Sequence, residues 1–279
     1  MHITGSKVRR LPTPPRLPSG RTSVSRWIEA MQSHGLQDFS VDEAHLALGG
    51  TLARIQVGLS RLAAKGVLVR PAKGIYVIVA PQHRSLGAPP PLWYIDMLMQ
   101  RLGLPYYVGL LSAAALHGAS SQAPQELQVV TTAQRPSKVI GRARIRWIAK
   151  RHLAESATQE MPTPTGSVRV STPETTALDL VRYARRAGYL NNVATVLADL
   201  AELLGADRLA QAAHHDLSTA RRLGYLLDVV GHNTLAADFH ARLPVRPKPP
   251  IRLDVSAPAG AGDIDPIWHL IINTTVEPD

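Results

Sequence analysis

The segment 61–79, RLAAKGVLVRPAKGIYVIV, constrains the fold of this chain most strongly. It begins as an apolar-periodic, helix-like stretch and reaches Gly66, a residue that suits the left-handed conformation at a helix end. Two short β-branched runs, VLVR and IYVIV, then flank PAKG, in which Lys73-Gly74 suits a tight turn. The segment therefore predicts a helix that runs directly into a β-hairpin.

The residues before this segment predict three helices in close succession. The first covers 22–36, TSVSRWIEAMQSHGL, whose apolar residues share one face. The second begins at a capping box formed by Ser40 and Glu43, and the third begins at Thr51 as its N-cap. The order helix, helix, turn, helix, strand, turn, strand is that of a winged helix-turn-helix, a DNA-binding fold. We expect this domain to span 22–80.

The third helix has two contrasting faces at about 100° per residue. One arc is apolar and is predicted to pack on the first two helices: Leu52, Ile55, Leu59 and Leu62. The opposite arc is basic, with Gly58 beside it: Arg54, Val57, Arg61 and Lys65. Arginines can reach base edges or phosphates, and Val57 can contact a thymine methyl group. Gly58 would let the helix backbone approach the groove wall. A solvated basic face is the alternative, but the order of the elements favours DNA.

The N-terminal 21 residues, MHITGSKVRRLPTPPRLPSGR, form a basic, proline-rich segment without an acidic residue. We expect a flexible arm that contacts phosphates or a minor groove, with a solvated tail as the alternative. Arg70 and Lys73 flank the tip of the predicted hairpin, where phosphates would be met. The predicted DNA-binding residues are therefore Thr51, Arg54, Val57, Arg61, Lys65, Arg70, Lys73, Arg9 and Arg10.

The charge distribution agrees with a nucleic-acid partner. The chain has a formal net charge of +10 and a pI of about 10.3, and residues 1–80 hold 11 Lys and Arg against four acidic residues. The absence of cysteine excludes disulfides and thiolate metal sites. No apolar run is long enough to cross a bilayer, and the N-terminus lacks the apolar core of a secretory signal. We therefore expect a soluble, cytoplasmic protein with no membrane partner.

Residues 81–91, with four prolines, are predicted to be a linker. Residues 92–279 then alternate between patterns: two helical segments, three strands (ELQVVTT, ARIRWIAK and SVRVS), a block of helices and two short closing strands. This pattern predicts an α+β chain in which an N-terminal winged helix-turn-helix precedes a larger mixed α+β C-terminal domain.

The second domain shows no catalytic signature. It has no Walker loop, no GxGxxG, no HExxH and no GxSxG, so we expect no catalytic residue, cofactor or metal. Asp263 and Asp265 have the spacing of a metal pair on a strand, but APAGAGDIDP is typical of a loop. Alternation along 142–150 places Arg142, Arg144 and Arg146 on one exposed face. We expect either a second basic surface, for DNA or an acidic partner protein, or an ordinary solvated face.

Five segments in order resemble the AbiEi family, the antitoxin half of a bacterial abortive-infection (type IV) toxin–antitoxin pair: KGVLVRPAKGIYVIV (65–79), YYVGLLSAAALHGA (106–119), VRVSTPETTALDLVRY (168–183), RRLGYLLD (221–228) and WHLIIN (268–273). The resemblance covers the chain from about residue 22 to its end. It implies that the N-terminal domain binds inverted repeats in its own operon promoter and represses it. It also implies that the C-terminal domain opposes a nucleotidyltransferase-like toxin, without enzymatic activity.

The resemblance carries the DNA-binding face over to Arg54, Arg61, Lys65, Arg70 and Lys73, but assigns no particular antitoxin residue. In RRLGYLLD, two arginines and an aspartate could meet a partner or form a buried ion pair. The alternative function is a ligand-responsive winged-helix regulator whose C-terminal domain binds a metabolite. An unrecognised enzyme in that domain is a third, weaker reading.

Overall fold

The computed structural model describes residues 23–119, 125–244, 249–257 and 262–278 of the chain. The chain divides into two compact units. Unit 1 consists of Met1–Leu104, Ser137–Ile145 and Thr163–Gly166, and unit 2 consists of Pro105–Pro136, Arg146–Pro162 and Ser167–Asp279. Both units contain helices and strands, which confirms the predicted α+β class. In the described residues no helix has the length and apolar character needed to span a membrane.

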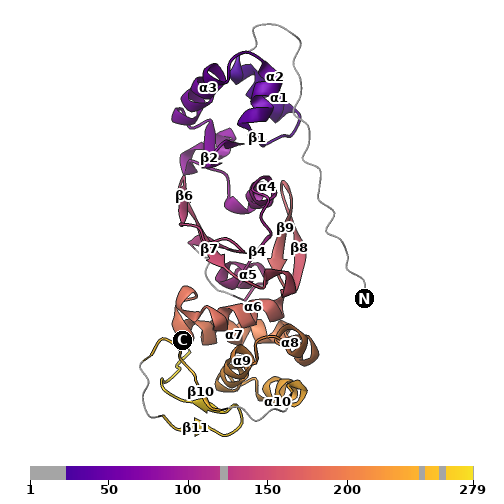
Figure 1. Ribbon diagram of the computed structural model, residues 1–279, viewed down its shortest axis with the longest axis vertical. Helices are drawn as coiled ribbons and strands as arrows, with labels where there is room; N and C mark the ends of the chain where they lie inside the picture. Colours follow the sequence, from indigo (N-terminus) through magenta and orange to yellow (C-terminus); the bar gives the residue numbers. More distant parts are fainter. Residues whose placement is uncertain (1–22, 120–124, 245–248, 258–261, 279) are drawn as a thin grey trace. The chain divides into compact units, whose positions relative to one another are not determined.

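Unit 1 begins with three helices and a small sheet (Figure 1). The helices are α1 (Val24–Ser33), α2 (Val41–Leu48) and α3 (Leu52–Ala64), and the strand order is β1 (Asp38–Ser40), β3 (Ile75–Ile78), β2 (Leu68–Ala72). The hairpin of β2 and β3 confirms the predicted strands. Strand β1 is not predicted, because a three-residue strand leaves no periodic signal. It exists through antiparallel pairing with β3, with Ser40 opposite Ile75.

The predicted starts of α2 and α3 are confirmed. Ser40 accepts a hydrogen bond from the Glu43 N–H at 3.1 Å, and Glu43 accepts one from the Ser40 N–H at 2.6 Å, which completes the capping box. The Thr51 hydroxyl caps α3. Gly49 and Gly50 both have positive φ, 65° and 80°, so this sharp turn between α2 and α3 favours glycine.

The core of this part of unit 1 confirms most of the predicted apolar face of α3. Ile55, Leu59 and Leu62 are buried with Trp27, Phe39 and other apolar residues. Leu52 is 40% exposed, so its prediction as a core residue is wrong. It lies in the first turn of α3, next to the glycine turn.

Gly58 does not have the predicted role of opening α3 toward a groove. A Cβ atom at this position would lie 2.7 Å from Cγ2 of Val24 in α1. The missing side chain therefore allows α1 and α3 to pack closely.

The rest of the N-terminal part of unit 1 contains η1 (Pro81–Leu86), η2 (Pro91–Trp93) and α4 (Ile95–Arg101). The Arg101 side chain, 8% exposed, donates to Asp38 at 2.7 Å and to Glu43 at 2.9 Å. Burial raises the pKa of Asp38, Arg101 acts to lower it, and the Glu43 charge raises it further. Arg101 thus neutralises two neighbouring carboxylates at the junction of β1 and α2.

We expect Arg101→Met to lower the free energy of unfolding by about 2–4 kcal/mol, because it leaves two partly buried carboxylates without a cation. Without Arg101 the folded-state pKa of Asp38 rises further above its unfolded value. The loss of unfolding free energy should therefore be full at neutral pH. It should shrink as the pH falls through the folded-state pKa of Asp38 in the variant, because the carboxyl is then protonated. Urea unfolding at pH 7 and pH 4 measures both effects. The exposed Arg84→Met is the control, and an equal, pH-independent loss in both variants would contradict the expectation.

A six-stranded sheet has the order β6 (Lys138–Ile140), β7 (Ala143–Ala149), β5 (Glu126–Thr131), β4 (Tyr106–Val108), β9 (Gly166–Ser171), β8 (Thr158–Thr163). β5, β7 and β9 confirm the three predicted strands. β4 replaces the start of the second of the two predicted helical segments, YVGLLSAAALHGA (107–119), and β6 and β8 are not predicted. β4 pairs antiparallel with β5 and parallel with β9, so partners on both sides decide its conformation.

The helices of unit 2 follow the predicted block closely, and α6 to α10 form one group (Figure 1). They are α5 (Leu110–Leu116), α6 (Pro173–Arg182), α7 (Tyr189–Leu200), α8 (Ala206–Ala212), α9 (Leu217–Val229) and α10 (Asn233–Arg242). Short 3-10 turns are η3 (Leu153–Glu155), η4 (Ala184–Arg186) and η5 (Ala201–Leu203), and the closing sheet contains β10 (Ile251–Arg252), β12 (Leu270–Ile271) and β11 (Ile264–Asp265). The apolar faces of these helices bury one large core.

A buried polar cluster joins the sheet of unit 2 to α6. The Lys150 ammonium donates to Asp179 at 2.7 Å, and the Tyr107 hydroxyl donates to the other carboxylate oxygen at 2.5 Å. Burial raises the pKa of Tyr107 far above its ordinary value, and the Asp179 charge adds to the rise. The tyrosine therefore stays protonated and acts as a hydrogen-bond donor in the core.

Two of the segments that carry the family resemblance meet inside unit 2. Gly224 of RRLGYLLD lies against the indole ring of Trp268 from WHLIIN, which is 1% exposed. The Trp268 Nε1–H donates to Asp228 at 2.7 Å. Arg221 donates to the carbonyl of Trp268 at 2.6 Å, and Arg222 donates to the carbonyl of Arg252 in β10 at 2.9 Å. The alternative of an ion pair among these residues is wrong, because they bind the closing segment rather than each other.

Candidate nucleic-acid interface

The outer face of α3 is basic, as its sequence predicts. The Thr51 hydroxyl accepts the Arg54 N–H at 3.4 Å, so its oxygen serves the start of the helix. Three cations are exposed along the face: Arg54, Arg61 and Lys65. Val57 lies among them and is 51% exposed. Helix α3 contains no acidic residue, so nothing on it neutralises these charges.

A groove of about 700 Å³ runs beside this face. Its walls are the start of α1, the turn between α2 and α3, and α3 itself: Ser23, Val24, Ser25, Leu48, Gly49, Gly50, Ala53, Arg54, Ile55, Val57, Gly58, Arg61, Leu62 and Lys65. None of the described residues that line it is acidic. The first N–H groups of α1 give this end of the helix a partial positive charge, which favours anions. The groove therefore combines three cations with a helix N-terminus.

The turn between β2 and β3 presents a further cation. Lys73 is exposed, and Gly74 has a φ of 76°, a value that favours glycine. The Gly74 carbonyl accepts a hydrogen bond from the Val41 N–H at 2.8 Å, which ties the turn to the start of α2. Arg70 is exposed on β2. Tyr76 is 5% exposed and packs in the core, as expected.

Only two of the three arginines of the second predicted basic surface are exposed cations in the structure. Arg142 and Arg144 are exposed and belong to unit 1, where the Arg142 N–H donates to the Leu86 carbonyl at 3.0 Å. Arg146 belongs to unit 2 and is ion-paired with Glu126. The expected common face of three free arginines is therefore reduced to two. Arg9 and Arg10 lie outside the described residues.

Sequence reasoning missed one wall of the groove. Ser23 to Ser25 are far from the basic residues of α3 along the chain, whereas the glycine turn directly precedes that helix. A serine at a helix start can be found as an N-cap, but only the packing of α1 on α3 brings it beside Arg54. Within the described residues, no group of three or more His, Asp or Glu could hold a metal ion.

The comparisons with known proteins include one family match and two similar solved structures. Residues 107–229 match the family model described as "AbiEi antitoxin C-terminal domain". A search of curated protein sequences finds no match. The structure is similar to that of the RV2827C protein from Mycobacterium tuberculosis, with a TM-score of 0.63 and 18% identity, over 91% of this chain and 94% of that chain.

A second solved structure, an antigenic nucleotidyltransferase-like protein from Paracoccidioides brasiliensis, is matched with a TM-score of 0.39 and 8% identity. That match covers 55% of this chain and 92% of the other. A similarity of this size carries no argument, whereas the first one supports a shared fold.

Proposed function

We propose that this chain, which belongs to the AbiEi antitoxin family, is a DNA-binding autorepressor and the antitoxin of a toxin–antitoxin pair. The observation that carries the DNA-binding half of the proposal is the outer face of α3. Its three cations surround an exposed valine, and they lie next to a groove without acidic residues. The order of α1 to α3 and the β2–β3 hairpin agrees with a winged helix-turn-helix, whose wing would be this hairpin.

In the proposed complex, α3 enters the major groove of the operator. Arg54 and Arg61 reach base edges or phosphates, and Val57 contacts a thymine methyl group. The start of α1 binds a backbone phosphate through its N–H groups. Lys73 and Arg70 contact the phosphate backbone beside the groove. Two copies of the chain would occupy the two halves of an inverted repeat.

The salt dependence of operator binding tests this arrangement. Five cations are available for phosphates: Arg54, Arg61, Lys65, Arg70 and Lys73. At about −0.9 per neutralised phosphate, log K should fall against log salt with a slope of about −4.5 for each bound copy. Fluorescence anisotropy with a promoter probe between about 50 and 200 mM salt measures the slope. A slope near zero would refute an interface made of these cations.

We propose that the C-terminal domain opposes a nucleotidyltransferase-like toxin and has no enzymatic activity of its own. The family match at residues 107–229 supports the antitoxin role. The first test is the neighbouring reading frame, which should encode the toxin and be transcribed together with this chain. Expression of that neighbour alone should arrest growth, and co-expression of this chain should restore it. A metabolic neighbour that leaves growth unaffected would favour the ligand-responsive regulator instead.

A further inference from the structure

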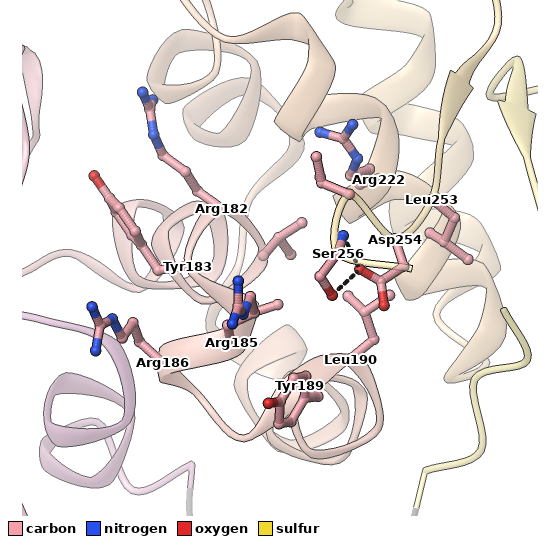
Figure 2. A pocket seen from close by; sticks show the side chains of 13 residues that line it. Arg182, Tyr183, Arg185, Arg186, Tyr189, Leu190, Arg222, Leu253, Asp254 and Ser256 are labelled. Atoms are coloured by element: carbon pink, nitrogen blue, oxygen red, sulfur yellow. Dashed lines mark hydrogen bonds between the residues drawn. The ribbon is translucent and has the colours of Figure 1, made fainter. Parts of the chain in front are cut away.

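Unit 2 contains a cavity of about 430 Å³ that the proposed function does not use (Figure 2). This volume lies in the range of small-molecule sites. Four arginines line the cavity: Arg182, Arg185, Arg186 and Arg222. Tyr183 and Tyr189 add two aromatic rings, and Asp254 is the one acidic residue among the lining residues. The cavity therefore has an excess of positive charge.

The interactions of these side chains show which charges remain available. Arg182 is paired with Asp216 at 2.9 Å. Within the described residues, the guanidinium groups of Arg185 and Arg186 make no hydrogen bond or ion pair, and both side chains are exposed. Asp254 already accepts the N–H and the hydroxyl of Ser256, both at 2.7 Å. Burial acts to raise the pKa of Asp254, while the hydrogen bonds from Ser256 and Ala257 and the charge of Arg185 lower it. Arg185 and Arg186 outnumber this one carboxylate among the lining residues, so net positive charge is left to meet an anion.

The start of α7 adds a second source of positive potential to the same cavity. Gly188 occupies the N-cap position, and no side chain caps this 12-residue helix. The first N–H groups of α7 can therefore bind an anion, as helix N-termini do. Tyr189, the first residue of the helix, has a φ of 69° and is 59% exposed. Such strained positions of non-glycine residues concentrate at ligand sites.

Hydrogen bonds from buried or partly buried amide side chains fix the backbone of the turn that carries Arg185 and Arg186. Gln128, 2% exposed, donates from its side-chain amide to the Arg186 carbonyl at 2.9 Å. Its side-chain oxygen accepts the Leu111 N–H at 2.9 Å, so the amide is fixed at both ends. Asn192 donates to the Ala187 carbonyl at 2.7 Å. The cations are thus presented on a preorganised turn, which lowers the entropy cost of binding.

We propose that this cavity binds a nucleotide. The phosphate would lie on Arg185, Arg186 and the start of α7, where planar guanidinium groups and N–H groups match its oxygens. The base would stack on the exposed ring of Tyr189, which lies near Arg185 in Figure 2, whereas Arg186 extends away from that ring. Arg222, on α9, lines the wall that also carries Asp254 and Ser256 (Figure 2). The inference does not depend on operator binding by α3.

The test uses isothermal titration of the full chain with the four ribonucleoside 5′-monophosphates, inorganic phosphate, a 5′-phosphorylated tetranucleotide and a hexaglutamate peptide. At least one nucleotide should bind saturably and more tightly than inorganic phosphate. Arg185→Ala with Arg186→Ala should weaken that binding by about 10-fold or more, since two charge-assisted contacts are lost. The control, Arg84→Ala with Arg151→Ala, removes the same charge from exposed positions outside the cavity and should bind normally.

The Tyr189→Leu variant distinguishes the contribution of the base to binding from that of the phosphate. It should weaken nucleotide binding by about 5-fold or more and leave binding of inorganic phosphate unchanged. If the tetranucleotide binds more tightly than the free nucleotide and the Arg185/Arg186 variant loses that binding, the natural ligand is the phosphorylated end of a nucleic-acid strand. Tetranucleotide binding that this variant retains counts against the cavity. The proposal is overturned if no nucleotide binds at millimolar concentration, if the control variant loses as much affinity, or if hexaglutamate binds more tightly than every nucleotide.

Discussion

Replacing Arg54 and Arg61 together by alanine is expected to lower the affinity for operator DNA by about 100-fold or more. A specific arginine contact contributes roughly 1–3 kcal/mol, and each 1.4 kcal/mol corresponds to a factor of about ten. Both side chains are exposed, and neither makes a side-chain hydrogen bond or ion pair within the part of the chain that the structure describes. The double substitution should therefore leave the melting temperature unchanged.

Fluorescence anisotropy with a promoter probe and a scrambled probe measures this effect. The matched control is Arg84→Ala with Arg151→Ala, which removes two exposed positive charges that do not lie on α3. The control should lose little affinity beyond the effect of net charge. Unchanged promoter affinity in the Arg54/Arg61 variant would show that another surface of the chain binds DNA.

The second large effect is expected at Gly224, where alanine should destabilise the protein by roughly 3 kcal/mol. In an ordinary helix interior, glycine to alanine stabilises by about 0.5–1 kcal/mol. Here the added Cβ would fall inside the van der Waals radii of three ring atoms of Trp268. That indole is fully buried and hydrogen-bonded to Asp228, so it cannot turn away. The steric cost should therefore exceed the gain in helix propensity.

Thermal and urea unfolding measure the loss, with Ser218→Ala at an exposed position of α9 as the control for helix propensity. A double-mutant cycle with Trp268→Leu isolates the contact. The substitution at Gly224 should cost much less in the background of that second variant, because the smaller leucine side chain makes room for the Cβ. If Gly224→Ala stabilises the wild-type protein, the close contact of α9 with this tryptophan is wrong.

Local signals in the sequence were sufficient for much of this structure. The capping box at Ser40, the cap at Thr51 and the turn at Gly74 each depend on residues close by in the chain, so a reader of the sequence finds them. The short strands β1 and β4 were missed for the opposite reason. Each is three residues long, and its conformation is decided by pairing with strands distant in the chain.

The candidate sites divide in the same way. The basic arc of α3 follows from helical periodicity alone, since a helix turns about 100° per residue. The groove beside it required the packing of α1, and the true role of Gly58 required the position of Val24. The cavity of unit 2 lined by four arginines could not be predicted from the sequence, because its walls come from three separate parts of the chain: residues 181–190, 222 and 253–256.

The sequence by itself determined the α+β class, the starts of α2 and α3, the basic face of α3 and the resemblance to antitoxins, because each depends on short-range pattern or on residue identity. Only the tertiary structure decided that Arg101 neutralises Asp38 and Glu43, and that Arg221 and Arg222 serve the closing strands. It also decided that Gly224 receives the ring of Trp268. Contacts between residues far apart in the chain depend on how whole elements pack, and no local pattern encodes that packing.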